Sequence, residues 1–419
     1  MSEKSDALRK LLDGHALMKG AQWAQQHEAR ELQRLAGDFE IEKCVPGEVV
    51  KEGDSGFYMV RHDFPLDTRQ GCIELGAALD VRAEHIAFSA CDSELHDFDP
   101  MTAVFIDTET SGLAGGAGTT AFLVGVGYFT ENVFRLDQCF MRDFDDEEPM
   151  LAYLATLFRR AETVVTFNGK SFDVPLLRTR FISNRLPFHL DGAMHFDLVH
   201  AVRRIWKMRL RDCSLGSIER HVLGIQRQGD VAGYEIPQLW FDYLRTRDAR
   251  ELPRVFYHHR NDILSLVSLT GLLSRCVEQP HGDDALQHHE DRLSMVRLHL
   301  RNKRWDDVVT HATKLLESDL DNVLRRECLD MLGNAAKRVQ NWTCMVDALT
   351  LMAHEFPSDH RPRLELAKHY EHRARNLPKA AQMCEEAIQY LAASDSPWLA
   401  EGFQHRLDRI YRKLNRPFL

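Results

Sequence analysis

The sequence predicts a protein of two parts: an α/β domain built on a mixed sheet flanked by helices, followed by an all-α domain of helical repeats. Between residues 98 and 276, three strand-like segments joined by short turns precede alternating helices and strands. Residues 285–419 are helical in pattern, and Trp305 and Trp342 stand in comparable settings 37 residues apart. The hydrophilic segment at 277–284 is the expected linker.

The first 97 residues are predicted to form an N-terminal extension, made of a helix followed by short strands. Residues 1 to 34 have helical character. Residues 35 to 97 hold strand-like pieces, such as Gly56–Arg61, among Gly, Pro and Asp turns. We expect this extension to pack on the domain at 98–276.

Composition limits the class of protein. A chain of 419 residues is too long for one core of ordinary size, and 44% hydrophobic with 28% charged residues is typical of soluble proteins. The longest apolar run, Ala121–Phe129, is far shorter than the roughly 20 residues of a membrane helix. The charged start lacks a signal sequence, so we expect a cytoplasmic protein without a membrane partner. Nine cysteines without a C-x-x-C pair predict reduced thiols and argue against a zinc ribbon.

The first chemical signal is the segment VFIDTETSGLAGGAGTTAFLVGVG at 104–127. An apolar strand leads into Asp107 and Glu109, and residues two apart on a strand share a face. Two carboxylates held that close repel, and hard ions such as Mg²⁺ or Mn²⁺ are the simplest means of neutralising them. The alternative is an edge strand with solvated acids. The glycine-rich run lacks the spacing of a phosphate-binding loop.

Three further acids stand at the start of a predicted helix or on one of its faces. Asp173 follows a short strand and a turn and stands at the start of a helix, where the alternative role is an acid favoured by the helix dipole. His258 and Asp262 are four residues apart, so they share one face of a buried helix. Asp197 also precedes a helix, and we expect it to cap that helix rather than bind a metal.

The ordered set of acids resembles the DEDD exonucleases of the ribonuclease-H-like superfamily. The closer resemblance is to bacterial YprB-like proteins, which join such a domain to a C-terminal tetratricopeptide (TPR) region. The segments that carry it are the one at 104–127, TFNGKSFDVPLLRTRF, FDLVHAVRRIWKMRLRDCSLGSIE, DVAGYEIPQLWFDYL and HHRNDILSL. The resemblance implies that two Mg²⁺ or Mn²⁺ ions are held by four acids: Asp107, Glu109, Asp173 and Asp262. It also implies 3′-5′ exonuclease action on nucleic acid, RNA or DNA.

The residue that accepts a proton from water is expected near the last acid. DEDD enzymes usually place Tyr four residues, or His five residues, before the final Asp, whereas here the two types are interchanged as Tyr257 and His258. The YprB-like pattern has His at the four-back position, which favours His258 as the catalytic base. An imidazole with a pKa near about 6.5 suits this task. Tyr257 is the second candidate, and a histidine without a function on the helix surface is the alternative.

Nucleic-acid contacts are expected despite the net charge of −10, because local charge decides such contacts. The stretch at 178–211 contains eight Lys or Arg against two acids, with four aromatic residues among them. We expect the aromatic residues to point inward. The residues predicted to bind nucleic acid are Asn168, Lys170, Arg203, Arg204 and Lys207.

The sequence therefore predicts a metal-dependent nuclease that acts on single-stranded ends, with helical repeats for a protein partner or the substrate. A third repeat is indicated by Arg375–Gln382 with LELAKHYEH before it, and such repeats usually bind peptides. An irregular helical bundle is the alternative for this region. For the whole protein, the alternatives are a catalytically silent interaction scaffold and an endonuclease of ribonuclease-H or resolvase type.

Overall fold

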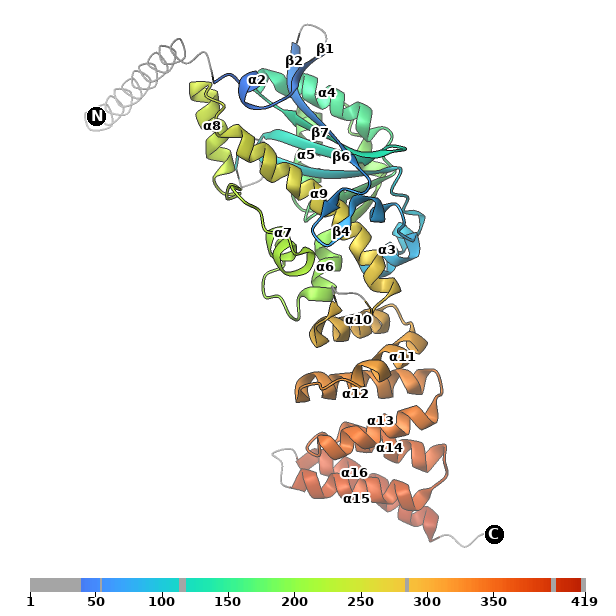
Figure 1. Ribbon diagram of the computed structural model, residues 1–419. Coiled ribbons are helices and arrows are strands. Elements are labelled where there is room, and N and C mark those ends of the chain that lie inside the picture. The colour runs from blue at the N-terminus through green and yellow to red at the C-terminus, as the bar shows by residue number, and fades with distance from the viewer. Residues whose placement is uncertain (1–38, 53–54, 113–117, 283–285, 393–396, 416–419) are drawn as a thin grey trace, which may run out of the picture. The chain divides into compact units, whose positions relative to one another are not determined.

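The computed structural model describes most of the chain (Figure 1). The described residues are 39–52, 55–112, 118–282, 286–392 and 397–415. The predicted helix within residues 1–34 and the glycine-rich residues 113–117 lie outside them. The chain divides into two compact units, Met1–Val202 with Asp212–Glu278, and Arg203–Arg211 with Gln279–Leu419.

The first unit is built on a seven-stranded sheet in the order β1-β2-β7-β6-β5-β8-β9. Its strands are β1 (Glu48–Glu52), β2 (Ser55–Pro65), β5 (Ala103–Thr110), β6 (Ala121–Phe129), β7 (Val133–Phe140), β8 (Thr163–Thr166) and β9 (Met194–Asp197). Within this sheet, β1, β2, β7, β6 and β5 each pair antiparallel with the next strand in that order. Strand β8 pairs parallel with both β5 and β9. A separate ribbon consists of β3 (Arg69–Gln70) and β4 (Ile73–Glu74). The predicted mixed sheet is confirmed.

The N-terminal strands belong to this same sheet. The predicted strand piece at Gly56–Arg61 lies within β2, which is 11 residues long and pairs with β7 from Tyr58↔Phe140 to Pro65↔Val133. Strands β1 and β2 thus extend the sheet at one edge, whereas η1 (Leu75–Ala78) and α3 (Ala83–Ala90) contact the long helix α9 (Leu252–Glu278).

Helices cover both faces of the sheet. In the first unit they are α2 (Ile41–Cys44), η1 (Leu75–Ala78), α3 (Ala83–Ala90), η2 (Ser93–Asp97), η3 (Phe144–Asp146), α4 (Glu147–Phe158), α5 (Asp173–Ser183), η4 (His189–Gly192), α6 (Leu198–Trp206), α7 (Leu215–Ile218), the π-helical η5 (Glu219–Leu223), α8 (Ile236–Thr246) and α9 (Leu252–Glu278). Adjacent residues of a strand point to opposite faces. On β7, Gln138 donates to the Phe256 carbonyl of α9 at 3.0 Å, and Asp137 accepts from Tyr153 of α4 at 2.7 Å. Helices α9 and α4 therefore lie on opposite faces (Figure 1).

The core of the first unit forms around the apolar strand β6, which is buried along nearly its whole length. Phe122 of β6 stacks on Trp240 of α8 with ring centroids 4.6 Å apart. The indole N–H of Trp240 donates to the Met141 carbonyl at 3.0 Å, so its one polar atom is satisfied in the core.

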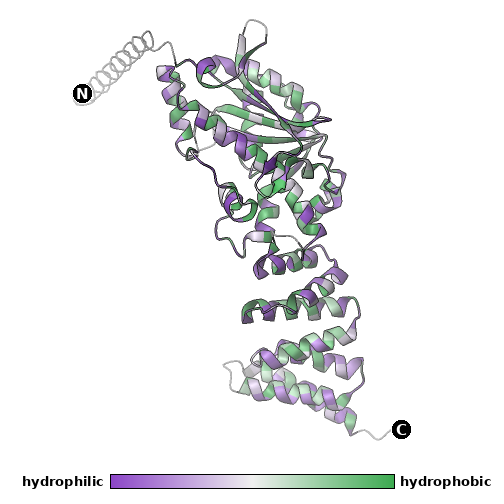
Figure 2. Ribbon diagram, viewed as in Figure 1, coloured by the Kyte–Doolittle hydropathy of each residue, from purple (hydrophilic) through white to green (hydrophobic). Residues whose placement is uncertain are grey.

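The second unit is formed by successive packed helices. They are α10 (His289–Arg301), α11 (Trp305–Leu316), α12 (Asn322–Arg338), α13 (Trp342–Glu355), α14 (Arg361–His372), α15 (Leu377–Ala392) and α16 (Pro397–Leu414). Apolar and polar residues alternate around each of them, as the colours of Figure 2 show. This confirms the predicted all-helical region, and Trp305 and Trp342 each begin a helix. Helix α9 continues to Glu278, so the first two residues of the expected linker at 277–284 are helical.

Among the described residues, no helix has both the length and the apolar composition needed to cross a membrane.

Candidate metal centre

The two acids of the D-x-E motif lie on β5, under α9. Asp107 pairs in register with Gly125 of β6, and a Cβ atom on Gly125 would come within 2.1 Å of Ile263 Cδ1. A glycine is therefore needed at position 125 for α9 to lie directly on the sheet. Asp107 and Glu109 share one face of β5, as residues two apart on a strand do, and α9 covers this face.

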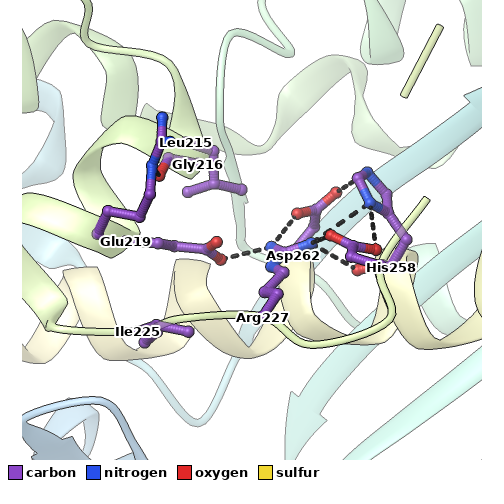
Figure 3. A pocket seen from close by; sticks show the side chains of 9 residues that line it. Leu215, Gly216, Glu219, Ile225, Arg227, His258 and Asp262 are labelled. Carbon is purple, nitrogen blue, oxygen red and sulfur yellow. Dashed lines mark hydrogen bonds and ion pairs between the residues drawn. The ribbon is translucent and has the colours of Figure 1, made fainter. Parts of the chain in front are cut away.

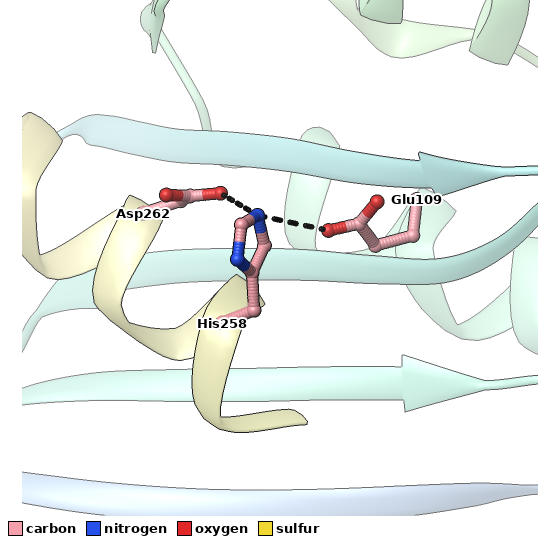
Figure 4. Close-up of side chains that lie close together, drawn as sticks. All are labelled: Glu109, His258 and Asp262. Carbon is pink, nitrogen blue, oxygen red and sulfur yellow. Dashed lines mark ion pairs between the residues drawn. The ribbon is translucent and has the colours of Figure 1, made fainter. Parts of the chain in front are cut away.

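Helix α9 brings a histidine and a third acid to the same place. His258 Nε2 lies 3.3 Å from Asp262 Oδ2 and 4.0 Å from Glu109 Oε1 (Figure 4). One possible ligand atom from each of these three residues lies within 4.8 Å of the other two. Within the part of the chain that the structure describes, Glu109, His258 and Asp262 form a group that could hold a metal ion.

Asp107 and Asp173 complete the acidic centre. Burial raises the pKa of Asp107 and Glu109 well above the ordinary range, and the charges of Asp262 and Asp173 raise both further. Burial also raises the pKa of Asp173 to about 6, although the Thr108 hydroxyl donates a hydrogen bond to its carboxylate. Crowded carboxyl groups of this kind favour a bound cation, and their oxygen atoms are the ligands that Mg²⁺ and Mn²⁺ prefer. The side chains present therefore fit divalent ions.

A second histidine fixes α9 to the acidic strand. His259 is fully buried, and its Nε2 lies 3.1 Å from the Asp107 carbonyl oxygen. A carbonyl accepts, so Nε2 carries the proton, and Nδ1 accepts from the Gln138 amide at 2.9 Å. Burial lowers the pKa of His259 to about 4, so the ring is neutral at pH 7. His259 thus links α9 to β5, with Nε2 also 3.9 Å from the Asp107 carboxylate, whereas its neighbour His258 lies beside Glu109 and Asp262.

Three charged residues that the sequence analysis did not single out adjoin His258 and Asp262: Glu219 and Arg227, which Figure 3 labels, and Asp230. Arg227 forms ion pairs with Asp262 and Glu219 through Nη2, and its Nη1 lies 3.3 Å from Asp230 Oδ2. Asp230 Oδ1 lies 2.9 Å from His258 Nδ1. Asp262 and His258 thus each contact a charged residue outside the acidic centre: Arg227 contacts Asp262, and Asp230 contacts His258.

These residues also form part of a pocket of about 360 Å³. Its lining is Leu215, Gly216, Glu219, Arg220, Ile225, Arg227, Asp230, His258 and Asp262. Apolar side chains from α7 and from the residues after η5 face the charged groups across this space (Figure 3). The pocket therefore adjoins the metal-binding group, and its lining combines apolar side chains, two arginines and three acids.

The turn between β8 and α5 is held by Asp197. Its carboxylate accepts hydrogen bonds from the backbone N–H groups of Asn168 at 2.7 Å, Lys170 at 3.0 Å and Val199 at 3.2 Å. The bond to Val199 caps α6, as predicted, and the other two fix the turn. Asn168 adopts a left-handed φ of 69°, which asparagine tolerates. Asn168 and Lys170 thus stand in a rigid turn just before Asp173.

The basic stretch at 178–211 does not form a single free surface. Three of its arginines form ion pairs: Arg178 with Asp191, Arg180 with Glu147 and Arg209 with Asp291. Its buried rings include Phe181, Phe196 and Trp206, so the expectation that the aromatic residues point inward is confirmed for them. Arg203 and Arg204 lie in the last turn of α6 and Lys207 directly follows it, and all three group with the second unit. Their contact with nucleic acid remains a prediction.

Two comparisons relate this arrangement to known proteins. The RNase H superfamily matches residues 104–274, a stretch that begins in β5 and ends in α9. The uncharacterized protein YprB of Bacillus subtilis (strain 168) is 31% identical over 319 residues, which cover 75% of this chain and 74% of that protein. The superfamily match contains the whole acidic centre: Asp107, Glu109, Asp173, His258 and Asp262.

Proposed function

Because the chain belongs to the family of YprB and carries a domain of the RNase H superfamily, we propose that it is a metal-dependent nuclease that hydrolyses phosphodiester bonds. The observation that supports this proposal is a cluster of four acids, in which burial and the charges of Asp262 and Asp173 raise the pKa values of Asp107 and Glu109. A cluster of this kind is costly to keep without bound cations.

The chemistry follows from what each side chain can do. Asp107, Glu109, Asp173 and Asp262 would hold the two Mg²⁺ or Mn²⁺ ions that the family resemblance implies. When bound, such ions supply the positive charge that activates water and stabilises the attacking and leaving oxygens at phosphorus. His258 directs Nε2 toward Glu109 and Asp262, and we assign to this atom the acceptance of the proton from water.

Exonuclease action on single-stranded ends, with 3′-5′ polarity, is proposed from the resemblance to the DEDD exonucleases. The 360 Å³ pocket beside His258 and Asp262 is the proposed place for the terminal nucleotide. Asn168 and Lys170, in the rigid turn before Asp173, are proposed to contact the substrate backbone. Further phosphate contacts are assigned to Arg203, Arg204 and Lys207.

The helical unit is proposed to be a TPR-like array that binds a protein partner or long substrates. Its support is a repeated contact between successive helix pairs. The Arg338 guanidinium lies 5.7 Å from the centre of the Trp305 ring, and that of Arg373 lies 3.9 Å from a ring of Trp342. The same cation–π contact at the start of α11 and α13 indicates two equivalent units.

The test is cleavage of end-labelled single- and double-stranded RNA and DNA by the full chain, with Mg²⁺ or Mn²⁺ or with EDTA. We expect stepwise shortening from one end, dependent on metal and absent in Asp107→Asn. Internal cuts in duplexes would replace exonuclease action by the endonuclease alternative. No cleavage of any substrate, or full activity in Asp107→Asn, would reject the proposal.

A further inference from the structure

We propose that residues 225–231, here called the anchor segment, position the two functional residues of α9. Arg227 fixes the orientation of the Asp262 carboxylate, and Asp230 fixes the imidazole of His258. Both are positioning residues, because they act through another side chain. The effect on reaction rate rests on the proposed nuclease function, whereas the effects on metal binding and on the histidine ring do not.

The anchor segment runs along one face of α9. The chain reverses after η5 at Gly224, whose φ is 72°. Residues spaced by three or four share a helix face, and four such residues of α9 contact the anchor segment or the start of η5: Arg254, His258, Asp262 and Ser265. Their partners are, in order, the Asp230 carbonyl at 3.1 Å, the Asp230 carboxylate at 2.9 Å, the Arg227 guanidinium and the Glu219 carboxylate at 2.5 Å. The segment is therefore tied to the helix along its length.

Arg227 selects which oxygen of Asp262 faces the other acids. Its guanidinium binds Asp262 Oδ1, while Oδ2 is the oxygen 3.3 Å from His258 Nε2. Arg227 is itself held by Glu219 and Asp230, and its side chain is only 10% exposed. A planar guanidinium with several fixed partners sets the angle of a carboxylate, which a single ammonium group cannot do.

Asp230 selects the tautomer of His258. Its ionised carboxylate lies 2.9 Å from Nδ1, much closer than the Arg227 guanidinium at 3.5 Å, and can only accept a hydrogen bond, so Nδ1 carries the proton. In the neutral ring the lone pair is then on Nε2, the atom directed at Glu109 and Asp262. This is the atom to which the proposed mechanism assigns the proton of water. Without Asp230, the ring could carry its proton on the wrong nitrogen or rotate away from the acids.

The role of Arg227 is tested by Mn²⁺ titration of Arg227→Lys, measured by isothermal calorimetry. The substitution keeps the charge, so a change in affinity reports geometry. We expect a Kd weaker by roughly 10-fold or more, the usual effect of losing a residue that orients a metal ligand. Arg245→Lys is the matched control, because Arg245 pairs with Asp242 at 2.6 Å on the exposed side of α8. Equal Mn²⁺ affinity in the wild type and in folded Arg227→Lys would overturn this role.

The role of Asp230 is tested by the isosteric change Asp230→Asn, with Asp242→Asn as control. We expect kcat to fall by roughly 10²-fold or more with KM unchanged, because an amide no longer enforces the proton on Nδ1. Nitrogen spectra of protein labelled in histidine should show the His258 signals, identified by their loss in His258→Gln, changing from the Nδ1–H to the Nε2–H form. Unchanged spectra and an unchanged kcat would overturn this role.

The outcomes separate this inference from the proposed function. If the wild type cuts no substrate but Arg227→Lys weakens Mn²⁺ binding and Asp230→Asn changes the tautomer, the anchor segment positions α9 and the nuclease assignment fails. If the wild type cuts and both variants behave as their controls do, the nuclease assignment stands and the anchor inference is rejected.

Discussion

Replacing Glu109 by Gln should stabilise the protein when no divalent ion is present and should weaken its stabilisation by Mn²⁺. The Glu109 side chain is only 13% exposed, and its carboxylate lies within 4.8 Å of a ligand atom of Asp262. Glutamine keeps the shape of the side chain and removes the charge. In the presence of a chelator the variant therefore lacks the repulsion that the wild type carries, whereas in Mn²⁺ it lacks a ligand.

The size of the effect follows from the distance. Two unit charges at the 4.8 Å limit repel by about 3.5 kcal/mol at an effective dielectric constant of about 20, and by about 0.9 kcal/mol in water. The ion pair between Asp262 and Arg227 offsets part of this repulsion. We therefore expect a gain of about 1 to 2 kcal/mol, which for a unit of this size raises the Tm by roughly 2 to 8 °C.

The gain should also depend on pH. Burial and the neighbouring acids raise the pKa of Glu109 in the folded protein above its usual value, so the folded wild type takes up a proton that the unfolded chain has released. Stability from this group is therefore full below the unfolded pKa of about 4.5 and is lost as the pH rises. Consequently, the advantage of Glu109→Gln should be larger at pH 8 than at pH 5.

The assay is differential scanning calorimetry of the wild type and the variant in EDTA and in saturating Mn²⁺. Glu147→Gln is the matched control, because Glu147 is also buried but pairs with Arg180 at 2.6 Å. Its neutralisation should lower the Tm equally in both conditions. A Glu109→Gln variant that is less stable than the wild type in EDTA, or that gains as much from Mn²⁺, would refute the reasoning.

Three further predictions test the centre and the helical unit. Gly125→Ala should destabilise the first unit by about 1 to 3 kcal/mol and weaken Mn²⁺ binding, because the new methyl group would overlap Ile263; calorimetry with unchanged values would contradict the packing. His258→Ala should lower kcat by roughly 10²-fold with little change in Mn²⁺ affinity, whereas Tyr257→Phe should have little effect on kcat. A larger loss of kcat in Tyr257→Phe than in His258→Ala would transfer the role of proton acceptor to Tyr257, and a large loss of Mn²⁺ affinity in His258→Ala would make His258 a metal ligand. Burial lowers the pKa of His299 to about 3, so below about pH 6.5 the unfolded chain binds a proton that the folded chain does not. The free energy of unfolding of the wild type should therefore fall by about 2 kcal/mol between pH 7 and pH 5, and that of His299→Leu should fall by less. Equal stability of the wild type at both pH values would contradict this.

Local patterns in the sequence predicted the elements that carry the acids. The apolar run at Ala121–Phe129 coincides with β6, and α5 begins at Asp173, the residue expected at a helix start. These features depend on neighbours within a few residues, where hydrophobic periodicity is informative. The place of β2 could not be predicted in this way. Its partner β7 lies about 75 residues further along the chain, and nothing in either strand alone specifies that pairing.

The charged residues behind the centre were missed for the same reason. Asp230 stands before α8 in a segment whose pattern indicates only a turn and a helix start, and Arg227 is three residues earlier. Their partners on α9 are 28 and 35 residues away. The charges of the sequence did carry a signal for a cation at this place. A buried helix that holds Asp262 close to further acids requires a positive charge nearby, and in the structure Arg227 supplies one.

The adjacent histidines show how packing determines the chemistry. Consecutive residues on a helix point about 100° apart, so His258 and His259 contact different acids: His258 lies beside Glu109 and Asp262, whereas His259 lies beside Asp107. The carbonyl of Asp107 and the amide of Gln138 hold His259 in the core, and Gly125 leaves the space in which its ring lies. Once His259 is fixed in that position, the rotation of α9 about its axis is fixed, and His258 and Asp262 must lie above Glu109. The position of the functional histidine is thus a consequence of a buried contact between helix and sheet, and a variant that disturbs His259 should displace His258 without touching it.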